Sequence, residues 1–150
     1  RSKNIFYILI FFLLVNNIYN CVRFHPFQNV YFNYLFEKKA NNLFEIDFWG
    51  LGNIKALEYL AKEKYKGEKI QIKVSSYTPL KYSKLILDKN LREIFSDMNT
   101  SNENQKFVFT NYTFESNPKF EKKYFIPENY DKIYSLKRGG IIINELFEKN

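Results

Sequence analysis

The sequence predicts an α/β protein in which one N-terminal transmembrane helix precedes a small extracytoplasmic α/β sandwich with a mixed sheet of about five strands. An unbroken apolar run from Ile5 to Val15 predicts the helix. Beyond it, segments with apolar residues at helical spacing alternate with segments in which every second residue is apolar, which is typical of helices packed on a sheet. The last two strand-like segments are joined by a short turn and predict an antiparallel hairpin.

The apolar run is barely long enough to cross a bilayer. A spanning helix needs roughly 20 mostly apolar residues, so the span has to continue to Val22 and include Asn16, Asn17 and Asn20. Polar amides in a membrane helix are stabilised when they face neighbouring helices. We therefore expect this helix to belong to a bundle.

Basic residues predict the orientation of this helix. Arg1 and Lys3 precede the apolar run, so the positive-inside rule places residues 23–150 outside the plasma (inner) membrane. A cleaved secretory signal is the competing interpretation, because a basic start and a short apolar core fit it too. No small-residue cleavage site follows, and the residues before Cys21 are too bulky for a lipid-attachment site. The chain lacks an initiator Met, so we expect it to be the tail of a larger membrane protein.

Composition limits the function classes. The net charge is +7, but the longest basic runs are the pairs Lys38-Lys39 and Lys122-Lys123, so no compact phosphate-binding stripe forms and we expect no nucleic acid partner. A single Cys excludes an internal disulfide and a cysteine-based metal site. His25 is the only His, so it is expected to act as a cap or an interfacial hydrogen-bonding group. We expect no metal site in this chain.

Three regions follow from these patterns. Residues 1–22 form the last transmembrane helix, residues 23–40 form an aromatic interfacial segment, and residues 41–150 form the extracytoplasmic domain. In the second region, Phe27 to Phe36 predicts a short helix that lies in the interface, where aromatic rings favour the headgroup level.

The alternation of apolar and acidic residues from Phe44 to Trp49 predicts the first strand of the domain. Glu45 and Asp47 would then share a face, where they either bind a cation or supply a general base, or are simply solvated. Trp49 either stacks on a sugar or is buried against the interfacial helix.

The remaining elements are expected in this order: a helix from Ile54 to Gly67, a strand from Lys69 to Ser75, one or two helices from Leu80 to Phe95, a loop from Met98 to Gln105, a strand from Phe107 to Phe114, and a hairpin of Ile133 to Lys137 and Ile141 to Phe147. Ser75, Ser76 and Thr78 are candidates to hold a phosphate at a helix start. Asn99 and Asn111 begin triplets that match the N-glycosylation pattern, which arises readily by chance in an Asn-rich chain.

Two blocks carry a resemblance to a known family. They run from His25 to Asn33 and from Phe44 to Leu51, the second leading into Lys55 to Leu60, and the residues that match are His25, Pro26, Gln28, Tyr31, Asn33, Glu45, Asp47, Trp49 and Gly50. This pattern resembles the C-terminal region of polytopic, family 39-like glycosyltransferases of the GT-C superfamily, the relatives of dolichyl-phosphate-mannose protein mannosyltransferases. In that family the first block follows the last membrane helix, and the second opens a small extracytoplasmic α/β domain.

The resemblance implies a function for a parent protein. Such enzymes transfer a sugar from a polyprenyl-phosphate donor to an acceptor outside the membrane, with an acidic residue of the first extracytoplasmic loop as the base and a divalent metal in some members. The implied partners are membrane lipid, other transmembrane helices of the parent chain and, through the parent, the donor. This chain would be a non-catalytic accessory domain without a cofactor, with Asp47 and Trp49 as its contacts to sugar or acceptor. The alternative is a stand-alone membrane-anchored or secreted binding module.

Overall fold

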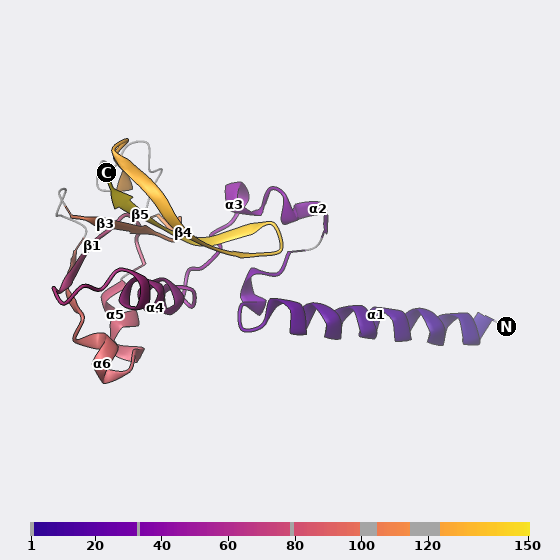
Figure 1. Ribbon diagram of the computed structural model, residues 1–150. Coiled ribbons are helices and arrows are strands. Elements are labelled where there is room, and N and C mark those ends of the chain that lie inside the picture. Colours follow the sequence, from indigo (N-terminus) through magenta and orange to yellow (C-terminus); the bar gives the residue numbers. More distant parts are fainter. Residues whose placement is uncertain (1, 33, 79, 100–104, 115–123) are drawn as a thin grey trace.

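A long helix projects from one side of an α/β body that also carries the C-terminus (Figure 1). This computed structural model describes residues 2–32, 34–78, 80–99, 105–114 and 124–150. The projecting helix, α1, spans Ser2–Phe24. Within the described residues it is the one helix long and apolar enough to cross a membrane, which confirms the expected N-terminal apolar helix.

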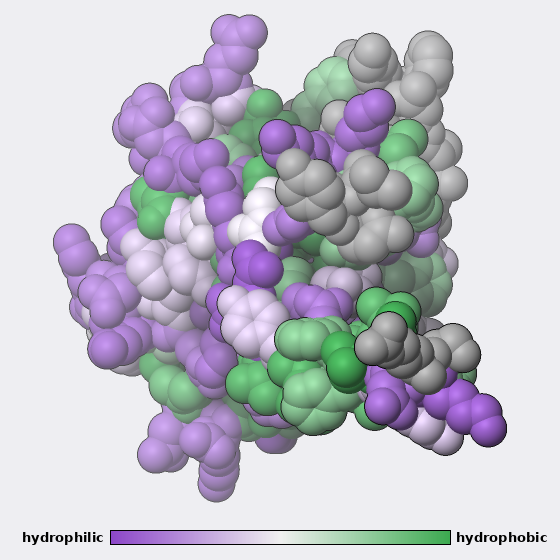
Figure 2. All heavy atoms as spheres, turned by 90° about the vertical axis from the view of Figure 1, so that its right-hand side faces the viewer, coloured by the Kyte–Doolittle hydropathy of each residue, from purple (hydrophilic) through white to green (hydrophobic). Residues whose placement is uncertain are grey.

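The surface of α1 is apolar on all sides. Its large apolar side chains from Ile5 to Val22 are all exposed, and Phe24 is the first to be buried in the body. In the view from the N-terminal end of α1, hydrophobic residues gather around the projecting helix in the lower part, while hydrophilic residues cover the left side of the body (Figure 2). A helix that is apolar all round needs an apolar surrounding, because exposed apolar area costs roughly 25 cal/mol per Å² in water.

The body is built on a mixed five-stranded sheet in the order β2-β1-β3-β5-β4. Its strands are β1 (Ile70–Val74), β2 (Phe95–Asn99), β3 (Phe107–Thr110), β4 (Tyr130–Arg138) and β5 (Ile141–Lys149). β1 pairs in parallel with β2 and β3, whereas β5 pairs antiparallel with β3 and β4. The α/β class and the mixed sheet are therefore confirmed.

Helices α4 (Asn53–Glu63) and α5 (Leu80–Ile86) pack against the sheet, and α6 (Lys89–Arg92) leads into β2. Leu57 and Leu60 of α4 join Ile72 of β1 and Phe109 of β3 in the main hydrophobic core. At the edge of this core Tyr59 stacks on Tyr134 of β4, with 4.7 Å between ring centroids. The helical spacing of apolar residues that predicted α4 thus corresponds to the face of the helix that is buried against the sheet.

The segment between α1 and α4 is fastened to the β4-β5 hairpin. It contains the 3-10 helix η1 (Gln28–Val30) and two short helices, α2 (Tyr34–Glu37) and α3 (Ala40–Leu43). Phe24, Phe27, Val30, Ala40 and Ile46 form a second core with Leu136, Ile141 and Ile143 of the hairpin. At the hairpin turn, the backbone N–H of Gly140 donates to Glu37 Oε1 at 2.8 Å. The single interfacial helix expected from Phe27 to Phe36 is wrong, because the chain turns repeatedly to bring these apolar residues onto the hairpin.

The strand predicted from Phe44 to Trp49 is also wrong. The chain bends there and forms a turn between α3 and α4 without a sheet partner. Ile46 enters the second core, while Phe44 and Phe48 remain about half exposed. The alternation of residue types therefore comes from a turn that buries one apolar and one acidic side chain.

The C-terminal half agrees better with the prediction. The helix from Ile54 and the strand from Lys69 are confirmed as α4 and β1, and the hairpin is confirmed as β4 and β5, with Gly139 at a positive φ of 58° in its turn. Leu80 to Phe95 contains two helices, but Phe95 already belongs to β2. The loop predicted from Met98 to Gln105 begins later than expected, because Met98 and Asn99 belong to β2. Residues 100–104 of this loop lie outside the described residues. β3 ends at Thr110, earlier than Phe114.

Candidate functional site

The His25 block forms the corner where α1 meets the body. His25 and Pro26 are exposed, while Phe27 and Val30 are buried. The Gln28 amide nitrogen lies 3.0 Å from His25 Nδ1 and donates to the carbonyl oxygen of Cys21 at 3.3 Å, so these side chains cover the open end of α1. This agrees with the hydrogen-bonding role expected of His25.

The same corner reaches back along α1. The side-chain amide of Asn20 donates to the carbonyl oxygen of Asn16 at 2.9 Å and lies 3.4 Å from the Tyr31 hydroxyl. Asn33, the last residue of the block, lies outside the described residues. The corner residues hold the helix and the body together, and no carboxylate takes part in these contacts.

Asp47 is the most constrained residue of the second block. Its side chain is 0% exposed, and its two carboxylate oxygens accept hydrogen bonds from the backbone N–H groups of Leu51 at 2.9 Å and Gly52 at 2.8 Å. Burial raises the pKa of this carboxyl, while these two N–H groups and the side chain of Asn29 lower it, and the net shift is upward. We call residues 47–52 the Asp47 turn.

Two glycines allow the Asp47 turn to pack closely. Gly50 has a φ of 68°, and a Cβ there would lie 2.6 Å from the Asn53 amide nitrogen. A Cβ on Gly52 would lie 2.7 Å from the amide nitrogen of Asn144 in β5. Gly50 excludes larger residues both by its positive φ and by the lack of space, whereas Gly52 excludes them by the lack of space alone.

Glu45 and Asp47 do not form the pair predicted from the sequence. Glu45 is exposed, whereas Asp47 points into the protein and is held by backbone donors. No group of three metal-ligating His, Cys, Asp or Glu side chains occurs among the described residues. Because its carboxylate accepts hydrogen bonds from two backbone N–H groups of the Asp47 turn, Asp47 stabilises this turn.

Trp49 is presented to solvent at the tip of the Asp47 turn. It is 78% exposed, and the neighbouring Phe48 packs edge-to-face on it with 5.3 Å between ring centroids. Burial of Trp49 against an interfacial helix is therefore wrong. Its free ring face is available for contact with a sugar, a lipid or another protein surface.

A buried polar cluster supports the Asp47 turn from below. The side-chain amide of Asn111, which follows β3, donates to the carbonyl oxygen of Asp47 and to the Thr78 hydroxyl, both at 2.9 Å. Asn53 and Asn144 are fully buried beside it. The sequence did not predict that these three Asn are buried, because nothing local distinguishes a buried Asn in an Asn-rich chain. Since Asn111 is buried and bonded, its glycosylation triplet is inaccessible in the fold.

The predicted phosphate site is not open to solvent. Ser75 and Ser76 are buried, and the Thr78 hydroxyl accepts from Asn111. These hydroxyl groups are thus part of the interior at the end of β1, beside the polar cluster.

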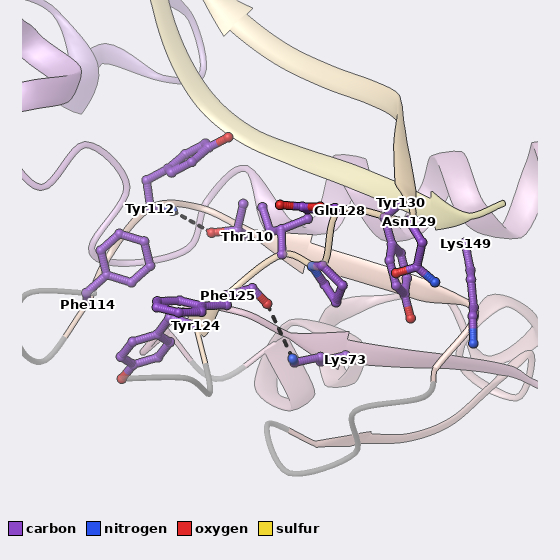
Figure 3. Close-up of a pocket in the computed structure, with 12 residues that line it drawn as sticks. Lys73, Thr110, Tyr112, Phe114, Tyr124, Phe125, Glu128, Asn129, Tyr130 and Lys149 are labelled. Carbon is purple, nitrogen blue, oxygen red and sulfur yellow. Dashed lines mark hydrogen bonds between the residues drawn. The ribbon is translucent and has the colours of Figure 1, made fainter. Parts of the chain in front are cut away.

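A pocket of about 730 Å³ lies on the face of the sheet that the helices leave uncovered (Figure 3). Lys73 of β1 and Thr110 of β3 form part of its floor, and the segment from Tyr124 to Tyr130 forms a wall. Because neighbouring strand residues alternate between faces, Lys73 points away from the core that contains Ile72 and Val74. The sequence did not indicate this pocket, because its walls come from segments up to 76 residues apart, from Lys73 to Lys149.

Fold and site together define a small α/β domain joined to a helix of membrane-spanning length and composition. No family model, curated protein or solved structure matches this chain.

Proposed function

We propose that this chain is the last membrane helix and the extracytoplasmic α/β sandwich domain of a membrane glycosyltransferase that uses a polyprenyl-phosphate sugar donor. The domain is an accessory one, and the catalytic groups and any divalent metal belong to other parts of the parent protein. The parent resembles family 39-like enzymes of the GT-C superfamily and resides in the plasma (inner) membrane. The observation that carries this proposal is the contact between the two sequence blocks on which the resemblance rests.

The two blocks form one structural unit, although they are separated in the sequence. Phe27 and Val30 of the first block share a core with Ile46 of the second. The side chain of Asn29 in the first block also lowers the pKa of the Asp47 carboxyl in the second. Both blocks therefore lie at the corner between α1 and the body, where the resemblance would place them.

One further feature fits an accessory role. The exposed Trp49 stands on a turn that buried hydrogen bonds hold in place. A rigid exposed aromatic ring suits a contact with the acceptor sugar or with the parent's other helices, because little conformational entropy is lost on binding.

Topology gives the first test. In a Cys21→Ser background, Lys66→Cys places one thiol on an exposed loop after α4. A membrane-impermeant maleimide added to intact cells should label it, since the domain lies outside. Protection from the reagent until the cells are lysed would contradict the proposed location.

The sugar-transfer role needs the full-length parent enzyme. We expect Trp49→Ala to lower transfer from the polyprenyl-phosphate donor by about tenfold, the effect of losing one well-packed aromatic contact, while Tyr65→Ala, which removes an exposed ring beyond α4, leaves the rate unchanged. Equal transfer rates for the two variants would show that Trp49 does not contact the acceptor. A gene in which a start codon directly precedes Arg1 would favour the stand-alone binding module.

A further inference from the structure

The pocket over the uncovered sheet face has the size of a small-molecule site. Its volume of about 730 Å³ falls within the roughly 300–1,000 Å³ common for ligand pockets. Phe114 and Tyr124 lie at one end, Asn129, Tyr130 and Lys149 lie at the other, and Lys73 extends between them towards Phe125 (Figure 3). The pocket thus has an aromatic end and a polar end.

Lys73 carries a buried positive charge at the floor of this pocket. The residue is 3% exposed, and its Nζ donates to the carbonyl oxygen of Phe125 at 3.3 Å. No carboxylate of the described residues lies within 4.0 Å of this ammonium group. Among the residues that the structure describes, the printed partner of this ammonium group is an uncharged carbonyl oxygen, so an anion in the pocket would stabilise it.

An acidic residue on the same sheet face, Glu145, is already engaged. Glu145 accepts hydrogen bonds from the Tyr112 hydroxyl and from Ser135 Oγ at 2.9 Å, and its Oε1 lies 3.2 Å from Lys132 Nζ. Burial and the bond to Glu145 raise the pKa of Tyr112, which keeps this hydroxyl a neutral donor. Three donors satisfy Glu145, so it does not serve as the counter-ion of Lys73.

The aromatic end of the pocket suits an uncharged, partly apolar group next to the anion. The rings of Phe114 and Tyr124 are 5.1 Å apart and tilted by 50°, so they form a bent apolar wall. The C–H face of a pyranose ring packs well on such a wall, and the Asn129 amide and the Phe125 carbonyl group can bond its hydroxyl groups. The carboxylate of Glu128 lines the pocket as well and disfavours a ligand with more than one anionic group.

We propose that this pocket binds a saccharide that carries a single anionic group, a phosphate or a carboxylate, which pairs with Lys73 while the sugar ring packs on Phe114 and Tyr124. The choice of a saccharide rests on the proposed function, whereas the anionic group follows from Lys73 alone.

Binding is measured by calorimetry on the full chain in detergent micelles. The probes are glucose 6-phosphate, glucuronate, the neutral methyl glucoside, inorganic phosphate and adenosine monophosphate. We expect glucose 6-phosphate or glucuronate to bind most tightly. Tighter binding of methyl glucoside, inorganic phosphate or adenosine monophosphate would overturn the proposal, as would no binding at all. The assay requires no sugar transfer, so its failure is distinct from failure of the proposed function.

Three variants assign the binding to Lys73. Lys73→Met should weaken it by about tenfold to a hundredfold, the loss typical of a charged hydrogen bond, whereas Lys55→Met, which removes the same charge from the exposed face of α4, should leave it unchanged. Glu128→Gln should tighten binding by about threefold, because it removes a weakly interacting exposed carboxylate. If Lys73→Met does not fold, the Glu128→Gln variant tests the site on its own. Unchanged or weaker binding of the anionic sugar by Glu128→Gln then overturns the proposal.

Discussion

Helices α1 and α4 are both regular, yet they meet their surroundings in opposite ways. In α4, Ala56, Leu57 and Leu60 are fully buried on the sheet while charged residues such as Lys55 face water. In α1, apolar side chains are exposed on every side from Ile5 to Val22. The chain thus contains one helix that buries a single apolar face on the sheet and another whose apolar side chains are exposed on every side, and the His25 corner joins the second to the body.

The first prediction tests this contrast through core stability. Leu60→Ala in α4 should lower the free energy of unfolding of the body by about 2–5 kcal/mol, because it leaves a cavity under the sheet. Leu9→Ala makes the same truncation on α1, where the side chain is 58% exposed. This variant should change the free energy of unfolding by less than about 0.5 kcal/mol. Denaturant unfolding in detergent, followed by circular dichroism, measures both. Similar losses in the two variants would mean that α1 packs into the body.

These two helices also show what sequence patterns can predict. The 3.6-residue period of α4 and the apolar run of α1 are local, and both were predicted. β2 was missed because Ser96 and Asp97 interrupt its apolar pattern and its parallel pairing with β1 is not visible in the chain. Phe44 to Trp49 was predicted as a strand because a turn that buries Ile46 and Asp47 can imitate alternation.

The second prediction sharpens the comparison at the Asp47 turn, which leads into α4. Asp47→Ala leaves the backbone N–H groups of Leu51 and Gly52 without acceptors and should cost about 1–3 kcal/mol of stability. Glu45→Ala removes an exposed neighbouring carboxylate and should have almost no effect. Thermal unfolding at neutral pH compares the two, and an equal loss would contradict the structural role of Asp47.

The same pair of variants has a predicted pH dependence. The folded protein raises the pKa of Asp47, so it holds this proton more tightly than the unfolded chain does. The resulting stabilisation is fully present below the unfolded pKa and is lost as the pH rises through the raised folded value. Relative to Asp47→Ala, the protein should therefore gain stability on acidification through that window. If the stability advantage over Asp47→Ala instead decreased on acidification, the backbone donors would lower the pKa of Asp47 by more than burial raises it.

The third and smallest effect concerns the junction itself. A Cβ on Gly139, which has a positive φ, would lie 2.3 Å from Glu37 Oε1 and 3.2 Å from the ring of Phe24. Gly67 also has a positive φ, but nothing lies within 4 Å of its added Cβ. Gly67→Ala should cost about 1 kcal/mol through backbone strain, and Gly139→Ala should cost about 1 kcal/mol more. Equal losses by thermal unfolding would mean that the hairpin turn is not packed against the end of α1.

The candidate site was less predictable than the fold. Asp47, Trp49 and Gly50 were singled out from the sequence, but their positions in the structure depend on contacts that no local pattern contains. Asp47 meets Asn111, 64 positions away, and Trp49 is exposed because the turn beneath it is held by these buried bonds. Lys73 looks like an ordinary outward residue of an alternating strand until the segment from Tyr124 covers it.

We propose that α1 spans a membrane and stays attached to the body. The most direct test is alkaline carbonate extraction of membranes that contain the chain, followed by mass spectrometry of the protein that remains. Our account predicts an intact chain that resists extraction and still includes Ile5 to Val15. A soluble protein whose first residue lies beyond Val22 would contradict it and identify the apolar run as a cleaved signal.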